Sequence, residues 1–213
     1  MAARTRKKAR VGRPPASTSI ETRARIIDAA RDCFGRYGYD RTTNQLIARK
    51  AGITSGAIYH YFESKQELFE SVASETLSAV LERFTGTIAE CTTAVDKLSA
   101  LLEAAVDLNG DDPSMATFVS SSPMEIRRHE QLLPLAARER VETERFFTEL
   151  VEDGKARGEI VPDVDTPAIV NMLMATTSGI ALYAAFVIDS EAHRAVIRAF
   201  ERLIAGTLFT AQG

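Results

Sequence analysis

The sequence contains no tryptophan, and it has only two cysteines and three histidines among 213 residues. Cys33 and Cys91 form no CxxC pair, which argues against a disulfide framework and favours a reducing, cytoplasmic compartment. His60, His129 and His193 are far apart and lack the spacing of metal ligands. We therefore expect no metal site and no cofactor.

Segments typical of export or of a membrane are also lacking. No apolar stretch follows the basic N-terminus, so we expect no signal peptide. Residues 166–188 carry no charge over a length that could span a bilayer. The segment nevertheless contains Pro167, Asn171 and the run Thr-Thr-Ser-Gly, and an acidic residue flanks each end. A helix buried on all sides within a protein fits this composition better, so we expect no membrane partner.

Charge is distributed unevenly along the chain. The hydrophobic content of 45% and charged content of 26% are typical of a globular protein with one or two compact units. Residues 1–65 hold 14 Lys and Arg against 5 Asp and Glu, a net charge of +9, whereas residues 66–213 hold 12 against 24, a net charge of −12. A basic head on an acidic body suggests that the head meets a polyanion.

Residues 41–65, RTTNQLIARKAGITSGAIYHYFESK, predict two short helices joined by a tight turn. Thr43 is a good N-cap for a first helix over Asn44–Ala51. We expect Gly52 to make the turn, because glycine readily adopts a positive φ.

A second short helix should follow through Phe62, capped by Thr54 or Ser55. The two helices can share a small apolar centre made of Leu46, Ile47, Ile53, Ile58 and Phe62. This arrangement is a helix-turn-helix, whose second helix can lie in the major groove of DNA.

The stretch AGITSGAIYHYFESKQELF resembles the DNA-binding signature of the tetracycline-repressor (TetR) family. The resemblance extends from Thr18 to Phe69, and the residues that carry it are Gly38, Tyr39, Thr42, Thr43, Ile47, Ala48, Ala51, Gly52, Gly56, Tyr59, Phe62, Lys65 and Leu68. Two positions depart from it, since Asn44 stands where an aliphatic residue is common and Ser55 where lysine is common. The resemblance implies a sequence-specific transcriptional regulator, in most members a repressor, that binds a double-stranded DNA operator.

Eleven residues around the two short helices are candidates for DNA contact. Because Ile58 and Phe62 point inward, Tyr59 and His60 should point outward, although aromatic packing and plain solvent exposure are the alternatives for them. The resemblance implies phosphate contacts by the start of the first short helix and by Lys65. The second helix offers no Arg, Asn or Gln for a bidentate base contact, so DNA shape should contribute to sequence choice. The full set is Thr42, Thr43, Asn44, Gln45, Thr54, Ser55, Gly56, Tyr59, His60, Tyr61 and Lys65.

Helical periodicity accounts for the rest of the chain, and we see no strand pattern and no repeat. The predicted helices cover residues 19–37, 44–51, 54–62, 64–84, 96–108, 114–129, 132–157, 166–188 and 191–209. We therefore expect an all-α fold of about nine helices. Its parts are a disordered basic arm (1–18), a three-helix helix-turn-helix DNA-binding domain (19–65) and a helical ligand-binding and dimerisation domain (66–213). The arm is either a solvated tail or a segment that follows phosphates, and the motif after it favours the second.

The C-terminal domain is expected to form a homodimer and to bind a small-molecule effector. The helix over 166–188 is apolar on all sides, so it is either internal in a monomer or packed against a second subunit. The resemblance implies that the last two helices of two subunits form a four-helix bundle. An apolar effector would shift the helix over 64–84. Residues that could line its cavity, or could simply form core, are Met115, Phe118, Met124, Phe146, Met172, Thr176 and Tyr183.

Two other classes of function are weighed against this one. An enzyme would need a nucleophile and base, or paired carboxylates, on facing elements, and no such pattern is visible. We therefore do not expect an enzyme. The remaining alternative is a helical protein–protein adaptor, or a ligand-binding protein without specific DNA readout. It would lack the steep salt dependence of phosphate binding.

Overall fold

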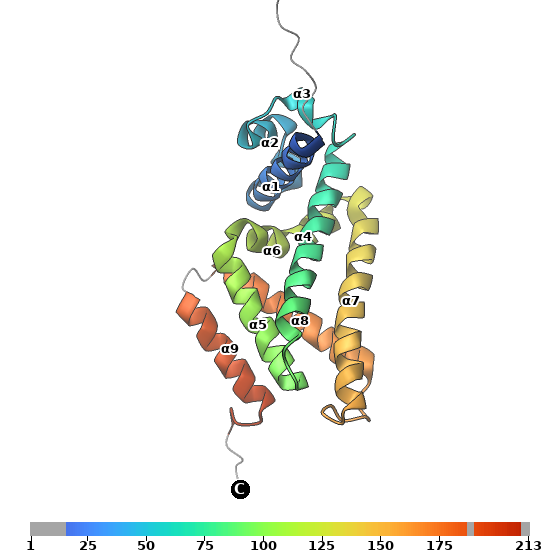
Figure 1. Ribbon diagram of the computed structural model, residues 1–213, viewed down its shortest axis with the longest axis vertical. Helices are drawn as coiled ribbons and strands as arrows, with labels where there is room; N and C mark the ends of the chain where they lie inside the picture. The colour runs from blue at the N-terminus through green and yellow to red at the C-terminus, as the bar shows by residue number, and fades with distance from the viewer. Residues whose placement is uncertain (1–15, 187–189, 210–213) are drawn as a thin grey trace, which may run out of the picture.

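The structure is a computed structural model that describes residues 16–186 and 190–209, and all elements in these ranges are helical. Figure 1 shows α1–α3 as a head above a body of the remaining helices, with α4 running from one into the other. The expected all-α fold is confirmed. Its elements are α1 (Ala16–Arg41), α2 (Asn44–Ala51), α3 (Ser55–Ile58), α4 (Lys65–Ile88), α5 (Ala94–Asp111), α6 (Pro113–Arg128), the 3₁₀ turn η1 (Glu130–Leu132), α7 (Leu133–Ala156), α8 (Thr166–Phe186) and α9 (Ser190–Ile204).

The first helix starts earlier than predicted and ends where predicted. α1 begins at Ala16, so the last three residues of the predicted arm are helical, while residues 1–15 lie outside the described residues. The regular helix is interrupted at Gly38, whose φ is 76°, directly after the predicted end at Tyr37. Helical periodicity predicts that Ile26, Ile27, Ala30, Cys33, Phe34 and Tyr37 face inward. The first five are buried, but Tyr37 is 49% exposed, so the prediction was wrong at the last turn.

Local signals at the joints determine the helix-turn-helix. The Thr43 hydroxyl accepts a hydrogen bond from the Leu46 amide at 3.2 Å and so caps α2. Gly52 ends α2 with a φ of 66°, as predicted. α3 is shorter than predicted because the amides of residues 60 and 61 bond three residues back in a tighter turn before the chain reaches Phe62.

Two body helices extend beyond their predicted bounds. α4 continues through Gly86 to Ile88, and α5 reaches Asp111, so only Asp112 separates it from α6. That residue ends one helix and caps the next, because its carboxylate accepts a hydrogen bond from the Ser114 amide at 3.0 Å.

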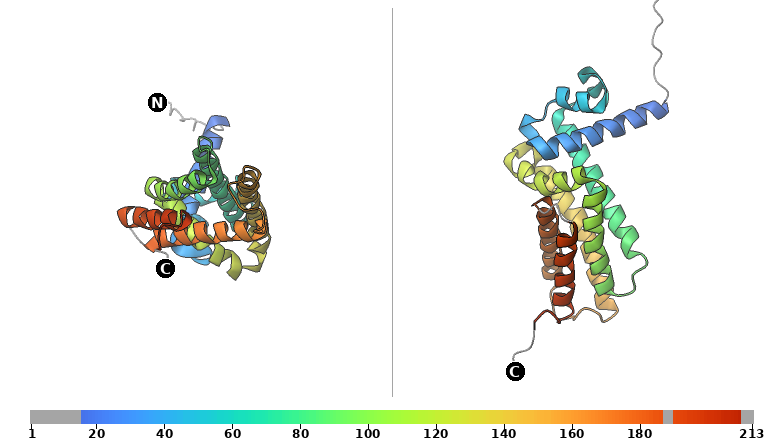
Figure 2. Two further views of the ribbon diagram at one scale, coloured as in Figure 1. Left: turned by 90° about the horizontal axis from the view of Figure 1, so that it is seen from below. Right: turned by 90° about the vertical axis from the view of Figure 1, so that its left-hand side faces the viewer.

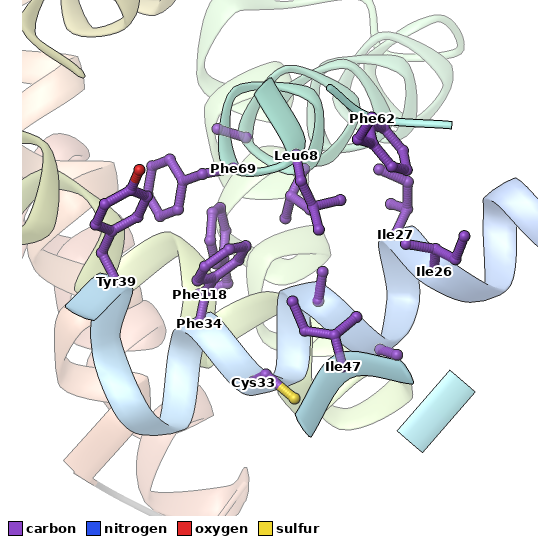
Figure 3. Packing of buried hydrophobic residues seen from close by; sticks show 14 of the residues in the cluster. Ile26, Ile27, Cys33, Phe34, Tyr39, Ile47, Phe62, Leu68, Phe69 and Phe118 are labelled. Atoms are coloured by element: carbon purple, nitrogen blue, oxygen red, sulfur yellow. The ribbon is translucent and has the colours of Figure 1, made fainter. Parts of the chain in front are cut away.

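One aromatic core joins the head to the body (Figure 3). Phe34 and Tyr39 of α1 pack against Phe69 of α4, which in turn packs against Phe118 of α6. The ring centroids of Phe69 lie 5.0, 5.4 and 5.5 Å from those of Phe34, Tyr39 and Phe118. Tilted aromatic pairs at such distances stabilise a fold beyond the burial of their area. This core therefore extends across the predicted domain boundary at residue 65.

Polar contacts hold the head at both ends of α6. At its start, the Arg31 guanidinium lies 2.7 Å from the carboxylate of Asp112. Near its end, the Tyr39 amide donates a hydrogen bond of 2.7 Å to the carboxylate of Glu125. Because these contacts stand on either side of the aromatic core, α6 and the head form a continuous packed unit.

The body has a second core between α4, α5, α7 and α8. Both views in Figure 2 place α8 and α9 on one side of the body and α4 on the opposite side. The buried members of this core are Phe84, Leu98, Leu101, Ala104, Phe147, Leu150, Val151, Val170 and Leu173.

We predict that the contact of His129 with the head stabilises the fold in a pH-dependent way. The pKa of His129 is raised because its Nδ1 lies 2.8 Å from the Glu125 carbonyl oxygen and its Nε2 lies 3.0 Å from the Asp40 carboxylate. Since the folded-state pKa exceeds the unfolded value of about 6.5, this stabilisation is complete below that pH and disappears as pH rises through the folded pKa. His129→Asn should lower Tm by a few degrees near pH 6 and by less near pH 8.5. An equal loss at both pH values would contradict the prediction.

Candidate nucleic-acid interface

The outer surface of the head is formed by the starts of α2 and α3 and by the turn after α3. Tyr59 is 60% exposed, whereas Ile58 and Phe62 beneath it are 1% and 2% exposed. Nothing lies within 4 Å of where a Cβ would stand on Gly56, so another molecule can approach the backbone there. The exposed residues among those predicted to contact DNA are here called the head surface, and they are Thr43, Gln45, Thr54, Gly56, Tyr59 and His60. Three further predicted residues are half-buried beside it, namely Asn44, Ser55 and Tyr61.

The structure removes Thr42 from this set. Its side chain is fully buried, and its hydroxyl lies 2.7 Å from the Gly38 carbonyl oxygen and 3.1 Å from that of Cys33. The hydroxyl therefore satisfies backbone acceptors released where α1 ends, instead of facing solvent. The Thr42 side chain is therefore not available to a phosphate, and a contact at the start of α2 stays a prediction for the exposed Thr43.

Lys65 also has a role that the sequence did not reveal. Its ammonium lies 3.0 Å from the Tyr39 carbonyl oxygen, 3.4 Å from that of Thr42 and 4.3 Å from the centre of the Tyr39 ring. The charge is thus stabilised by two carbonyl dipoles and an aromatic face within the protein. These partners give Lys65 a role in the fold, and the phosphate contact that the resemblance implies for it stays a prediction. Lys65 ties the start of α4 to the chain between α1 and α2.

The side chain of Asn44 carries a hydrogen-bond acceptor without a donor in the described part of the chain. Its Oδ1 is buried and has no hydrogen-bond partner among the described residues. A buried polar atom without a partner is unfavourable in the free protein. The side chain is only half-buried as a whole, so it lies at the edge of the head surface.

Most basic side chains of the head are already engaged within the protein. Contacts to acidic groups or to carbonyl oxygens are made by Arg23, Arg25, Arg31, Arg36, Lys50 and Lys65. The side chains of Arg41 and Arg49 are exposed and make no ion pair or hydrogen bond in the part of the chain that the structure describes. They lie just before α2 and in its last turn. Sequence reasoning missed both, although their positions at the two ends of α2 could have indicated them.

This arrangement suits a groove better than it suits a small molecule. The head surface projects outward and offers hydroxyl, amide and imidazole groups beside two guanidinium groups. Guanidinium groups bind phosphate through two parallel hydrogen bonds, and exposed polar side chains can contact the base edges in a DNA groove.

A separate cavity of about 190 Å³ lies in the body. It is enclosed mainly by apolar side chains from α4, α5, α6, α7 and α8. Its lining residues are Leu77, Val80, Leu81, Phe84, Ala105, Leu108, Ala116, Val119, Thr143, Phe147, Thr177 and Ser178.

None of the seven residues predicted to line a ligand cavity belongs to this lining. Phe118 is in the aromatic core under the head, and Phe146 lines a shallow depression on the body surface. Met124 and Met172 are more than half exposed, and Tyr183 is 39% exposed. The other two, Met115 and Thr176, are half-buried away from the cavity. The cavity lies on helices that carry the predicted residues but on adjacent faces, because Ala116, Val119, Phe147 and Thr177 each follow a predicted residue by one position. Ligand contact by the seven residues stays a prediction.

Several large apolar side chains of α8 and α9 are exposed in the part of the chain that the structure describes. Met172 and Leu182 of α8 are 55% and 49% exposed, and Leu203 of α9 is 46% exposed. These residues lie on the two helices that form one side of the body (Figure 2). Exposed apolar groups gathered on one side indicate an interaction surface more strongly than scattered ones do.

The structure adds two findings about sites of other kinds. Over residues 16–186 and 190–209, no three His, Cys, Asp or Glu side chains are grouped so that they could hold a metal ion. Within the same ranges, every helix is too short or too polar to cross a bilayer.

Comparison with protein families gives two matches along the chain. Residues 26–72 match the family of bacterial regulatory proteins of the tetR type. Residues 94–208 match the C-terminal domain of BetI-type transcriptional repressors.

Individual proteins resemble this chain over most of its length, in sequence or in fold. The HTH-type transcriptional regulator UidR of Escherichia coli K12 is 25% identical over 159 residues, which cover 75% of this chain and 79% of UidR. Salmonella enterica GusR superimposes with a TM-score of 0.73 at 26% identity, over 89% of this chain and 96% of GusR. FadR of Bacillus subtilis in complex with stearoyl-CoA superimposes with a TM-score of 0.75 at 22% identity, over 87% and 99% of the two chains.

We predict that Tyr59→Ala weakens DNA binding alone, whereas a substitution of Lys65 lowers stability as well. Tyr59→Ala should weaken binding to double-stranded DNA about tenfold at unchanged Tm, because the exposed ring supports nothing in the fold. Lys65→Met should also lower the free energy of unfolding by about 1–3 kcal/mol, because two carbonyl oxygens lose their donor. Duplex titrations and thermal melts measure both effects. Val141→Ala, at an exposed position of α7, is the control and should change neither. Unchanged stability of Lys65→Met would contradict the structural role.

Proposed function

The chain belongs to the TetR family of bacterial regulatory proteins, and from this membership we propose that it is a homodimeric repressor released from its DNA operator by a small molecule. It is a helix-turn-helix DNA-binding transcriptional regulator, as its family is. Binding to chromosomal DNA requires the protein to be in the cytoplasm. The observation that carries the proposal is the head surface, where polar groups project outward over the buried side chains of Ile58 and Phe62.

The head surface supports a division of labour between base contacts and phosphate contacts. Tyr59, His60 and the open backbone at Gly56 would enter the major groove, with Gln45 from α2 beside them. The candidates for phosphate contact are the exposed Thr43, Thr54, Arg41 and Arg49, together with the half-buried Asn44, Ser55 and Tyr61. No side chain of α3 can make a bidentate hydrogen bond to a base, so groove shape and van der Waals contacts would supply much of the sequence choice.

The exposed face of α8 and α9 supports a homodimer. A second copy would cover Met172, Leu182 and Leu203 with the same residues of its own, as a two-fold interface requires. Two heads related in this way can enter successive major grooves about 34–36 Å apart. One head alone would bury too little surface for a specific affinity.

The body cavity supports release by an effector. A cavity of about 190 Å³ is somewhat larger than an engineered apolar cavity of about 150 Å³ that binds benzene. A larger ligand would have to push apart the helices that line it, and these include α4, which leads to the head. A coupling free energy of about 1–3 kcal/mol would lower operator affinity about 5–150-fold.

We predict salt-sensitive binding to duplex DNA. The purified chain should enrich a distinct sequence from a pool of random duplexes. Its affinity for that sequence should fall about 10³-fold or more between 50 and 200 mM salt, because several phosphates release their counterions. Failure to retain any duplex in dilute buffer, or an affinity independent of salt, would overturn the proposed function.

We predict that a charge on α8 separates the subunits. Met172→Glu should convert the dimer to a monomer, because the carboxylate would be buried without a counter-charge in the apolar interface. Sedimentation measures the change, and operator affinity should fall with it. Val141→Glu, which charges an equally exposed apolar position on α7, is the matched control and should remain dimeric. A Met172→Glu protein that is still dimeric would place the interface elsewhere.

A further inference from the structure

The polar groups of the cavity wall are arranged to accept hydrogen bonds. The Thr143 hydroxyl donates to the Glu139 carbonyl oxygen at 2.9 Å, and the Thr177 hydroxyl donates to that of Leu173 at 2.9 Å. Each hydroxyl hydrogen is therefore used within its own helix, and only oxygen lone pairs face outward from it. No Lys, Arg or His is among the lining residues. Apart from the hydroxyl of Ser178, which can also donate, the described wall thus presents acceptors to a ligand, and it presents no cation.

An acidic residue lies on the same helix face next to this wall. Glu139 precedes Thr143 by one turn of α7 and Phe147 by two, and both of these line the cavity. The Glu139 side chain is half-buried, on a face that is otherwise buried at Leu135 and Leu150. An acid on the inward, largely apolar face of a helix is unusual in a protein core.

The carboxylate of Glu139 makes no ion pair within the described residues, although the positive charge of nearby Arg138 acts to lower its pKa. The neighbouring Arg138 pairs with Glu70 at 3.0 Å, and Arg140 pairs with Glu144 at 2.6 Å. Burial, followed by the nearby charge of Glu142, raises the pKa of Glu139 to about 7. The free protein therefore holds an acid that a buried cation would stabilise in its ionised form.

A second polar atom without a partner lies one turn before the lining residue Val80. Thr76 of α4 is 2% exposed, and its hydroxyl has no hydrogen-bond partner among the described residues. Both Thr76 and Glu139 lie on the head side of the lining residues of their helices. The Thr76 hydroxyl and the Glu139 carboxylate thus lie just beyond the cavity lining, toward the head.

We propose that the cavity takes a small apolar amine whose protonated nitrogen pairs with the carboxylate of Glu139. This inference rests on the proposed effector role of the cavity and adds the chemical class of the effector. The apolar part of the ligand would lie against Val80, Phe84 and Phe147. A carboxylate or phosphate ligand is the wrong charge, because it would face Glu139 with no cation in the wall to offset it.

Three probes of similar size and different charge test the proposal on the full-length chain. Benzylamine is cationic, benzyl alcohol is neutral and benzoate is anionic at neutral pH. Titrations followed by NMR should give the tightest binding for benzylamine and the weakest for benzoate. Glu139→Gln should weaken benzylamine binding about tenfold or more, as expected for the loss of a charged hydrogen bond. The same variant should leave benzyl alcohol binding within a factor of two.

A matched variant and a stability measurement separate pairing from general damage. Glu149→Gln removes an exposed acid further along α7, which does not affect the pKa of Glu139, and should leave benzylamine binding unchanged. Glu139→Gln should fold, because it removes an unpaired charge. The parent protein should lose stability relative to it as pH rises from about 4.3, the unfolded pKa, to about 7, because the folded state resists losing this proton.

The outcomes distinguish this inference from the proposed function. Benzoate binding as tight as benzylamine binding, no benzylamine binding at all, or equal benzylamine affinity of parent and Glu139→Gln would each overturn the inference. Duplex binding by the same preparations would then leave the repressor function standing. Failure of the parent protein to bind any duplex would overturn the proposed function, whatever the amine does.

Discussion

Aromatic packing between α1, α4 and α6 determines how the head is held on the body. Burying one large apolar side chain stabilises a fold by about 1.5–3 kcal/mol, which exceeds the usual value of the exposed ion pairs beside this core. Phe34, Phe69 and Phe118 are all fully buried. The residue after Phe118 is Val119, which lines the cavity. α6 therefore presents one face to the head and another face to the site proposed for the effector.

This packing limits how an effector could act on the head. Protein interiors are close-packed, so a ligand that widens the cavity displaces whole helices and not single side chains. Two lining helices, α4 and α6, also carry rings of the aromatic core. The start of α4 is tied to the end of α1 through Lys65 and the Tyr39 carbonyl oxygen. A displacement in the body would therefore tilt the head as a unit and move both short helices together.

The sequence was sufficient where a feature depends on neighbouring residues. Thr43 as a cap, Gly52 as a turn and the bounds of α2 follow from local hydrogen bonds and backbone preference, and all three are confirmed. It was insufficient where a feature depends on which face of a helix is buried. Consecutive residues of a helix differ by about 100° in direction. Phe146 and Phe147 are the same residue type, but only Phe147 lines the cavity, whereas Phe146 lines a separate depression. The contacts of the Lys65 ammonium within the protein were not predictable either, because its partners lie more than 20 residues away in the sequence.

The positive charge of the head is less available than its sequence suggests. Of the net +9 over residues 1–65, much comes from side chains that hold the head together or fasten it to the body, as Arg31 does with Asp112. Arg41 and Arg49 remain at the ends of α2, and six further Lys and Arg lie in residues 1–15. Two free guanidinium groups release few counterions, so one head without its arm would bind phosphates weakly. The second head of the proposed dimer would double the number of such contacts, which is a physical reason for this head to act as one of a pair.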